Sequence, residues 1–248
     1  EIAGDFLRRF RIEEGKPFGE VYSRGLLRDS EGRVLIDGAT GLPRVTPGFT
    51  VKVANYNPDW LGGMQNILTY KNFSFSFLID VRQGGTISSL GNAIIFADGL
   101  TEETLEGREG GLIFGKNFYA NETAVIGDGT EPAGTVLPEN EMEITAESFW
   151  LKVGGRNAPV GEMFVVEASN IRFREAVLGY SLPSTVLSNT PFRKVSISFV
   201  GRNLFFISNK AKNIDPDTMV GTSASGWGYD AFGPPTARSY GFNLNLGF

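Results

Sequence analysis

The sequence predicts an all-β protein whose antiparallel strands form the C-terminal part of a large transmembrane β-barrel of the 22-stranded type, with long extracellular loops and short periplasmic turns. Three observations favour this class. Several segments alternate between apolar and polar residues, the connections between them alternate between short and long, and the final strand closes on an aromatic residue. Barrel strands alternate in this way because one face contacts lipid while the other faces a polar interior.

The final strand, residues 239–248, has the clearest alternation. Apolar side chains occupy one of its faces, and Ser, Gly and Asn occupy the other, because successive side chains of a strand point to opposite sides. This pattern resembles the signal by which barrel proteins are handed to their membrane-insertion machinery. We therefore predict a C-terminal assembly signal formed by Tyr240, Phe242, Leu244, Leu246 and Phe248.

The first half of the chain contains four predicted strands. Residues 5–12 and 18–28 flank a tight turn that contains Gly and Pro. After a long loop with one small hairpin at Arg33–Ile36, residues 63–71 and 73–82 form a strand pair around a turn at Lys71-Asn72. In the second strand of this pair, odd-numbered residues from Phe73 to Val81 are apolar, and the even-numbered ones are polar except Leu78.

The second half contains three more predicted strands. Residues 84–162 are mostly irregular. A strand follows at 164–182, where a slip in the alternation near Glu175-Ala176 predicts a β-bulge, and another strand covers 194–207 before the final one.

The lengths of the connections predict the topology. Short connections at 13–17, 71–72 and 183–193 alternate with long ones at 29–61, 84–162 and 208–237. If Phe248 lies at the periplasmic end, every short connection is periplasmic and every long one is extracellular, as in outer-membrane barrels. Seven strands cannot close a barrel of even strand number, and an open edge in lipid is costly. Residues 1–248 are therefore expected to be the C-terminal portion of a larger barrel, with no plug domain in this chain.

Composition and charge exclude several function classes. The chain has no His and no Cys, which excludes the Ser-His-Asp triad, zinc sites built on His or thiolate, and a disulfide scaffold. A net charge of −5 disfavours nucleic acid as a partner. No run of 18 apolar residues is present, so no transmembrane helix is expected. We predict neither enzyme activity nor a cofactor.

Two groups of side chains are candidates for function within a barrel. Arg172, Arg174 and Arg202 lie in predicted strands and are expected to face the lumen, since a charge on the lipid side costs ~2–4 kcal/mol at the midplane. Trp227, Tyr229 and Phe232 lie among glycines in an external loop. Aromatic faces suit stacking on a sugar or a peptide, so these three are candidates for contact with a ligand or a lid protein, and packing within the loop is the alternative.

Five motifs, in order along the chain, resemble the SusC/RagA family of TonB-dependent outer-membrane receptors. They are Glu14-Gly-Lys-Pro-Phe-Gly19 with Val21-Tyr22; Asn57-Pro-Asp-Trp-Leu-Gly-Gly63 leading to Tyr70-Lys71-Asn72-Phe73; Ala168-Ser-Asn-Ile-Arg-Phe-Arg-Glu175 with Leu178-Gly-Tyr-Ser-Leu-Pro183; Gly201-Arg-Asn-Leu-Phe205; and Asp215-Pro216 with Pro234-Pro-Thr-Ala-Arg-Ser-Tyr240. The third is the most specific, and Asn170 departs from it where the family often has Tyr.

The resemblance implies a multi-pass barrel in the outer membrane of a Bacteroidetes-type bacterium, active in the import of oligosaccharides or peptides. It also implies a SusD-like surface lipoprotein as a lid. Coupling to TonB-ExbB-ExbD would pass through an N-terminal part that these residues do not contain.

Two other classes are weighed against the importer. One is a soluble all-β carbohydrate-binding or adhesin module with two packed sheets. The other is a β-sandwich glycosidase that uses two carboxylates, for which the candidates are Asp98, Glu102, Glu103, Glu106 and Glu109. A solvated loop is the favoured interpretation of those acids, and Asp215 and Asp217 are interpreted as loop acids because they lack the spacing of a calcium-binding loop.

Overall fold

A computed structural model describes residues 3–218 and 226–248. The chain divides into two compact units. We call residues 58–85, 167–218 and 234–248 the strand unit, and residues 1–57, 86–166 and 219–233 the loop unit. Each unit is described by itself.

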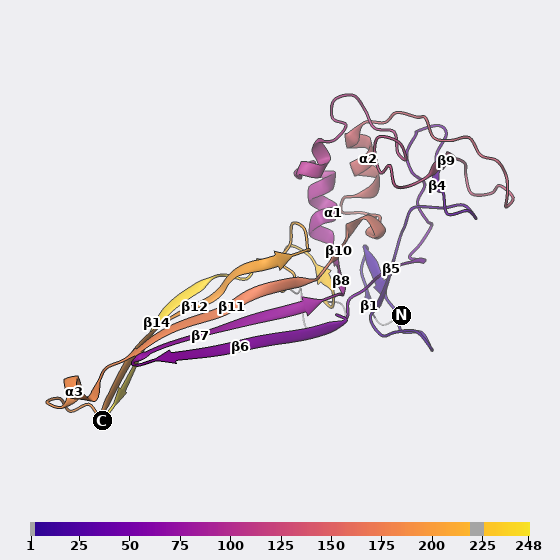
Figure 1. Cartoon of the computed structure of the whole chain (residues 1–248). Helices are drawn as coiled ribbons and strands as arrows, with labels where there is room; N and C mark the ends of the chain where they lie inside the picture. The colour runs from indigo at the N-terminus through magenta and orange to yellow at the C-terminus, as the bar shows by residue number, and fades with distance from the viewer. Residues whose placement is uncertain (1–2, 219–225) are drawn as a thin grey trace. The chain divides into compact units, whose positions relative to one another are not determined.

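The strand unit is one antiparallel sheet of five long strands (Figure 1). Their order is β14-β12-β11-β7-β6. The strands are β6 (Trp60–Tyr70), β7 (Phe73–Gln83), β11 (Asn170–Ser181), β12 (Lys194–Asn209) and β14 (Ser239–Gly247), and a short helix, α3 (Ser184–Leu187), lies between β11 and β12. Four of the five predicted strands of this sheet agree with the structure within a few residues.

The predicted strand at 164–182 is divided in the structure. Its first part is β10 (Val165–Glu167), which pairs with a different sheet, and its second part is β11. The predicted bulge is confirmed close to its expected position, because the register of β11 shifts between Phe173 and Glu175 against both neighbouring strands. Against β7, Arg174 is the extra residue.

The loop unit contains short elements. Its strands are β1 (Ala3–Gly4), β2 (Arg8–Phe10), β3 (Glu20–Ser23), β4 (Val34–Ile36), β5 (Val51–Asn55), β8 (Thr86–Ser89), β9 (Ala124–Ile126) and β13 (Tyr229–Asp230). Its helices are α1 (Leu90–Ala97) and α2 (Ala146–Val153), and two turns of 3-10 helix are η1 (Glu102–Leu105) and η2 (Gly161–Phe164). The sheets are β1-β2-β3-β5, β10-β8-β13 and the parallel pair β4-β9.

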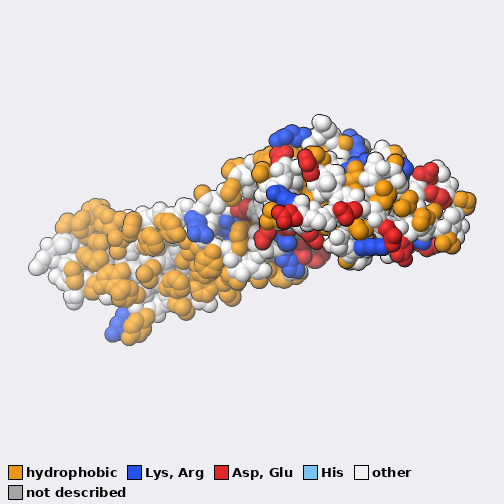
Figure 2. Space-filling view, turned by 90° about the horizontal axis from the view of Figure 1, so that it is seen from above, with side chains coloured by type: hydrophobic (Ala, Val, Ile, Leu, Met, Phe, Trp, Pro, Cys, Tyr) orange, Lys and Arg blue, Asp and Glu red, His pale blue; other side chains and the backbone are white. Residues whose placement is uncertain are grey.

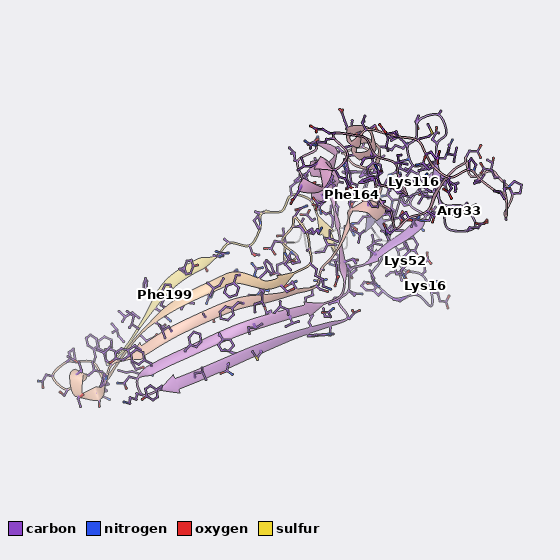
Figure 3. All side chains as sticks on the ribbon, turned by 45° about the horizontal axis from the view of Figure 1, so that its top comes forward. Lys16, Arg33, Lys52, Lys116, Phe164 and Phe199 are labelled. Carbon is purple, nitrogen blue, oxygen red and sulfur yellow. The ribbon has the colours of Figure 1, made fainter. Side chains whose placement is uncertain are left out.

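The core of the loop unit is aromatic and aliphatic. Phe114, Phe118, Phe149 and Trp150 contact one another, with ring centroids 4.8–6.3 Å apart, and Phe164, labelled in Figure 3, belongs to the same buried cluster. Both helices begin at a side-chain cap. Ser89 accepts the backbone N–H of Asn92, and Thr145 that of Ser148, which satisfies an N–H left free in the first turn.

The structure corrects the prediction for residues 5–28. These residues were expected to form two long barrel strands, but they form the short strands β2 and β3 of a separate sheet in the loop unit. The alternation of Phe6, Phe10 and Ile12 with arginines resembled a lipid-facing pattern. In the structure Phe10 is buried in a small core with Val21 and Ala54, whereas Phe6 and Ile12 are exposed. The alternation in this segment therefore does not mark a lipid-facing strand.

In the strand unit, the connections follow the predicted pattern. The short connections, at 71–72 and 182–193, lie at one end of the antiparallel sheet. All the longer segments join the strands at the other end of the sheet. That end is formed by Trp60, Gln83, Asn170, Asn209 and Ser239. Long and short connections of these five strands therefore lie at opposite ends, as predicted. The predicted short connection at 13–17 lies in the loop unit instead.

Candidate functional site: two faces of the five-stranded sheet

One face of the five-stranded sheet is apolar across its full width. We call it the apolar face, and the strand registers place the following side chains on it: Met64, Leu68, Tyr70, Phe73, Phe75, Phe77, Ile79, Val81, Ile171, Phe173, Ala176, Leu178, Tyr180, Val195, Ile197, Phe199, Phe205, Tyr240, Phe242, Leu244 and Leu246. Figure 2 shows the apolar side chains gathered over the long strands. None of these side chains is fully buried, and most of them are exposed.

Aromatic rings line up across neighbouring strands on this face. Phe77, Phe173 and Phe205 form a stack over three strands, with centroid distances of 5.9 and 5.2 Å. Phe199, labelled in Figure 3, contacts Phe242 at 5.3 Å. Although cross-strand pairs of this kind stabilise a sheet, Phe242 remains 79% exposed and Phe205 50% exposed. An apolar surface of this extent on a protein marks a contact with lipid or with another apolar partner.

The opposite face, which we call the polar face, carries small and polar side chains. Ser74 and Ser76 of β7, Ser196 and Ser198 of β12, and Asn243 and Asn245 of β14 share it, together with Gly179 of β11 and the apolar exceptions Ile67, Leu78, Val177 and Val200. Charged side chains on this face concentrate toward the end of the sheet from which the long connections leave.

Arg172 is the most buried of these charges, with a side chain that is 3% exposed. Its Nη1 atom lies 2.6 Å from Oδ2 of Asp217 and 3.4 Å from Oδ1 of Asp215. Its Nη2 atom donates to Oγ1 of Thr236, and its guanidinium lies over the ring of Phe206, 4.3 Å from the centroid. A buried guanidinium needs such partners because an uncompensated charge away from water is costly.

Arg174 continues the same network. Its Nε atom donates to Oδ2 of Asp80 at 2.7 Å, and its Nη1 atom donates to Oδ2 of Asp217 at 2.7 Å and to Asn203 at 3.2 Å. Asp217 therefore bridges two arginines of one strand. We call Asp80, Arg172, Arg174, Asp215, Asp217 and Thr236 the arginine network.

The bulge in β11 explains how consecutive charges reach the polar face. Phe173 and Ala176 both lie on the apolar face, because they pair with Ile79 and Phe77. The intervening Arg174 and Glu175 can therefore both reach partners on the polar face. There Glu175 accepts a hydrogen bond from Nε of Arg202 at 2.7 Å. Arg172, Arg174 and Arg202 thus all have their ionic partners on the polar face, and contact with cargo remains a prediction.

The arginine network also holds two loop segments against the sheet. The backbone N–H groups of Asp217 and Thr236 donate to the two oxygens of Asp215, at 3.0 and 2.9 Å. Burial opposes ionisation of Asp215, but the hydrogen bonds from Thr236 and the backbone together with the charge of Arg172 outweigh it and lower the pKa of Asp215. Residues 215–217 and 236 are therefore joined through one ionised carboxylate.

Sequence reasoning identified the arginines but not their partners. Asp215-Pro216 was noted only as part of a motif, and Asp215 and Asp217 were interpreted as incidental loop acids. Asp80 could have been found, because it lies on the same polar face as the arginines and on the adjacent strand. The partnership with Thr236 depends on the path of a loop and has no sequence signal.

The three candidate aromatic residues occupy different environments in the loop unit. Tyr229 is 7% exposed, with the guanidinium of Arg8 over its ring at 4.7 Å, and burial raises its pKa to about 12. Trp227 packs against the rings of Phe10, Phe18 and Tyr56. Phe232 is 58% exposed and is the member of the group best placed to touch a ligand.

The predicted assembly signal lies along an edge of the sheet. Tyr240, Phe242, Leu244 and Leu246 lie on the apolar face, and Phe248 follows β14 with its ring 5.1 Å from that of Phe192. All five side chains are exposed. Their role in membrane assembly remains a prediction.

Within 3–218 and 226–248, no group of three or more acidic side chains is arranged to hold a metal ion. No helix in this part of the chain is both long and apolar enough to cross a membrane. The acids Asp98, Glu102, Glu103, Glu106 and Glu109 lie around the end of α1 and η1.

The chain is similar in sequence and in fold to known proteins. No family model matches the chain. In sequence it is similar to TonB-dependent receptor P26 from Formosa agariphila, with 24% identity over 198 residues, which is 76% of this chain and 17% of that receptor. In structure it is similar to the RagAB peptide importer in its closed-closed state, with a TM-score of 0.53 and 12% identity over 92% of this chain, and in its open-open state, with a TM-score of 0.53 and 12% identity over 96% of this chain.

The chain spans 24% of the importer chains that it matches in structure and a smaller share of the curated receptor. The resemblance to the SusC/RagA-type TonB-dependent receptors, predicted from the five motifs, is confirmed. The proteins that it resembles are a receptor and an importer rather than enzymes, which agrees with the prediction that the chain has no catalytic role.

Proposed function

We propose that this chain forms five of the strands of a TonB-dependent outer-membrane barrel that imports nutrients. The observation that carries the proposal is the apolar face of the five-stranded sheet, which is exposed in a sheet whose opposite face is polar. A lipid-facing and a lumen-facing side account for both properties at once. In a soluble module with two packed sheets, Phe73, Phe75 and Phe77 would instead be covered.

The connections support an orientation for these strands. The end with the short connections and Phe248 is periplasmic, and the end from which the long segments leave is extracellular. The loop unit then belongs to the cell exterior. Its exposed Phe232, which lies in the same segment as the packed Trp227 and Tyr229, is proposed to face a SusD-like lipoprotein or the cargo.

The remaining parts of the importer lie outside these residues. Closure of the barrel requires further strands beside β6 and β14, because unpaired backbone groups in hydrocarbon cost several kcal/mol each. Energy coupling is proposed to use TonB-ExbB-ExbD through the N-terminal part. The cargo is proposed to be an oligosaccharide or a peptide, and Arg172, Arg174 and Arg202 are proposed to line the lumen.

Two neighbouring residues of β12 test the membrane assignment. Phe199 lies on the apolar face and Ser198 on the polar face. In the full-length receptor, Phe199→Arg is expected to lose about 2–4 kcal/mol of stability in the bilayer, whereas Ser198→Arg keeps its charge in water. Folded receptor is counted by its heat-dependent migration in gels after membrane extraction. Equal losses for the two variants would contradict a lipid-facing sheet.

Uptake by cells tests the import assignment. Cells that lack the receptor are expected to lose uptake of a fluorescent peptide or oligosaccharide mixture, and the wild-type gene is expected to restore it only while the membrane is energised. A receptor that inserts normally but leaves uptake unchanged for both cargo classes would contradict the proposed function.

A further inference from the structure

The end of the five-stranded sheet that has the short connections carries positive charge without acidic residues. It consists of residues 68–76, 177–200 and 241–248. These segments contain no Asp or Glu, and their charged side chains are Lys71, Arg193 and Lys194, all of which are exposed. In the view of Figure 2, basic but no acidic side chains appear over this end of the long strands.

The three cations are not neutralised within the protein. The ion pairs of the strand unit all involve other basic residues, so none of the three has a carboxylate partner in the described part of the chain. The acids of the strand unit lie toward the opposite end of the sheet, where the arginine network holds several of them. The charge at the short-connection end can therefore attract an external anion.

Two of the cations lie at the border of the apolar face. Nζ of Lys71 lies over the ring of Tyr70, 5.4 Å from its centroid, and Tyr70 belongs to the apolar face. The backbone N–H of Arg193 donates to the carbonyl of Gly247 at 2.8 Å, which continues the pairing of β12 with β14. Alternation from Val195 places Arg193 on the side of the apolar face.

Aromatic side chains lie between these cations and the rest of the apolar face. Tyr70 is 72% exposed and Phe73 is 54% exposed, and the ring of Phe73 lies 4.7 Å from that of Tyr180. Membrane barrels place aromatic rings of this kind at the boundary between hydrocarbon and headgroups. Along the strands, aliphatic and phenyl groups are thus followed by a belt of aromatic rings and then by cations, which is the order of hydrocarbon, interface and phosphate in a bilayer.

Lys71 and Arg193 belong to one continuous rim. The backbone N–H of Ser181, at the end of β11, donates to the carbonyl of Asn72 at 2.8 Å, which joins the β6–β7 turn to the connection that leads to Arg193. The strands β7, β11 and β12 are neighbours, so the two cations are separated by two strand spacings, roughly 10 Å. Lys and Arg side chains can lay their stems along apolar surface and extend their charges toward the headgroups.

We propose that this rim, formed by Lys71 and Arg193, binds the phosphate of an anionic phospholipid headgroup. The acyl chains lie against the apolar face, and the two cations donate to phosphate oxygens, for which the fork of a guanidinium is well suited. This inference rests on the proposed membrane function, which assigns the short-connection end to the periplasmic side, where an outer membrane presents phospholipid.

Lys194 provides a matched control. It is adjacent to Arg193 in sequence, but its pairing with Gly247 and its alternation with Ser196 and Ser198 place it on the polar face. Its replacement by Gln changes the net charge of this end by the same amount as Arg193→Gln, without removing a cation from the border of the apolar face.

Fluorescence quenching in the full-length receptor tests the lipid site. A bimane label on Asn189→Cys, in the exposed connection before Arg193, is specific within these 248 residues because they contain no Cys. The receptor is reconstituted in phosphatidylcholine vesicles that contain a small fraction of nitroxide-labelled phosphatidylglycerol or of phosphatidylcholine with the same labelled chain. Since the nitroxide quenches only a nearby fluorophore, the ratio of the two signals measures which lipid is enriched next to the rim.

Phosphatidylglycerol is expected to be enriched at least fivefold over phosphatidylcholine, and less as salt is raised, because exposed charges are screened. Arg193→Gln should lower the enrichment about fivefold, the effect of one basic residue near an anionic lipid surface. The double variant Lys71→Gln/Arg193→Gln should abolish it, and Lys194→Gln should leave it unchanged. Each variant is first checked for the heat-dependent gel shift of the folded receptor.

Equal quenching by the two lipids, or equal losses for Arg193→Gln and Lys194→Gln, would overturn the proposal. Displacement of labelled phosphatidylglycerol by lipid A at lower concentrations than by unlabelled phosphatidylglycerol would overturn the assignment to a phospholipid. A receptor that imports cargo without this enrichment would overturn the lipid site alone. Enrichment in a receptor whose loss leaves uptake unchanged would instead overturn the import function.

Discussion

At the scale of single residues, Asp217 is the centre of the arginine network. It accepts one hydrogen bond from Arg172 and one from Arg174 through the same oxygen. Hydrogen bonds between charged partners are shorter and stronger than neutral ones, and Arg172 is nearly inaccessible to water. The network therefore fixes residues 215–217 to the polar face at the level of individual side chains.

Removal of the bridging charge tests this role. Asp217→Asn in the full-length receptor is expected to reduce the local stability of the loop by about 2 kcal/mol, the loss typical of a hydrogen bond to a charged group. Amide hydrogen exchange of residues 211–218 should then be about 30-fold faster. The control is Asp59→Asn, since Asp59 is exposed and forms no ion pair within the described part of the chain. Similar exchange in both variants would show that Asp217 is not an anchor.

The lowered pKa of Asp215 predicts the pH dependence of the same loop. A carboxyl group whose pKa is lower in the folded state stabilises that state above its unfolded pKa, and this stabilisation is lost as the pH falls through the lowered value. The loop should thus keep its closed conformation at neutral pH and open only below about pH 4. An environment-sensitive dye on Lys212→Cys reports the opening, and Asp215→Asn should remove the acid transition. A transition near neutral pH would contradict this assignment.

At the scale of elements, β14 combines three properties that rarely occur together. It is an edge strand, its apolar residues all lie on one face, and those residues are exposed. An exposed apolar edge strand invites pairing with another strand. Within a barrel it would pair with a further strand, and during assembly it would be available to the insertion machinery.

Substitution of Phe248 tests this role of β14. Phe248→Ala is expected to slow membrane insertion of the full-length receptor because it removes the terminal aromatic, whereas Phe248→Tyr should insert at the wild-type rate. Pulse-chase labelling followed by the heat-dependent gel shift measures the rate. Unchanged insertion of Phe248→Ala would count against the assembly signal.

At the scale of the whole molecule, the five-stranded sheet is incomplete as a membrane structure. Both edge strands, β6 and β14, have a neighbour on only one side in the described residues. An open edge leaves backbone N–H and C=O groups without partners in hydrocarbon. The apolar face also requires a nonaqueous environment, because its aromatic and aliphatic side chains are exposed.

Isolation of the 248-residue chain tests this requirement. Expressed alone, the chain is expected to aggregate in buffer, to need detergent, and to lack the heat-dependent gel shift that the full-length receptor shows. The measurements are sedimentation in the two solvents and gel migration with and without boiling. A monomer that is stable in buffer would favour the soluble module instead.

Local pattern in the sequence determined the strands β6, β7, β12 and β14, the bulge in β11, and the separation of long from short connections, because alternation and turn residues act between near neighbours. Only the tertiary structure decided that residues 5–28 belong to the loop unit, that Tyr229 is buried, and that Asp80, Asp217 and Thr236 complete the arginine network. The physical reason is that the alternation of side chains along a strand shows which residues share a face, but it does not show what covers that face. Partners brought together by loops of many residues leave no periodic signal.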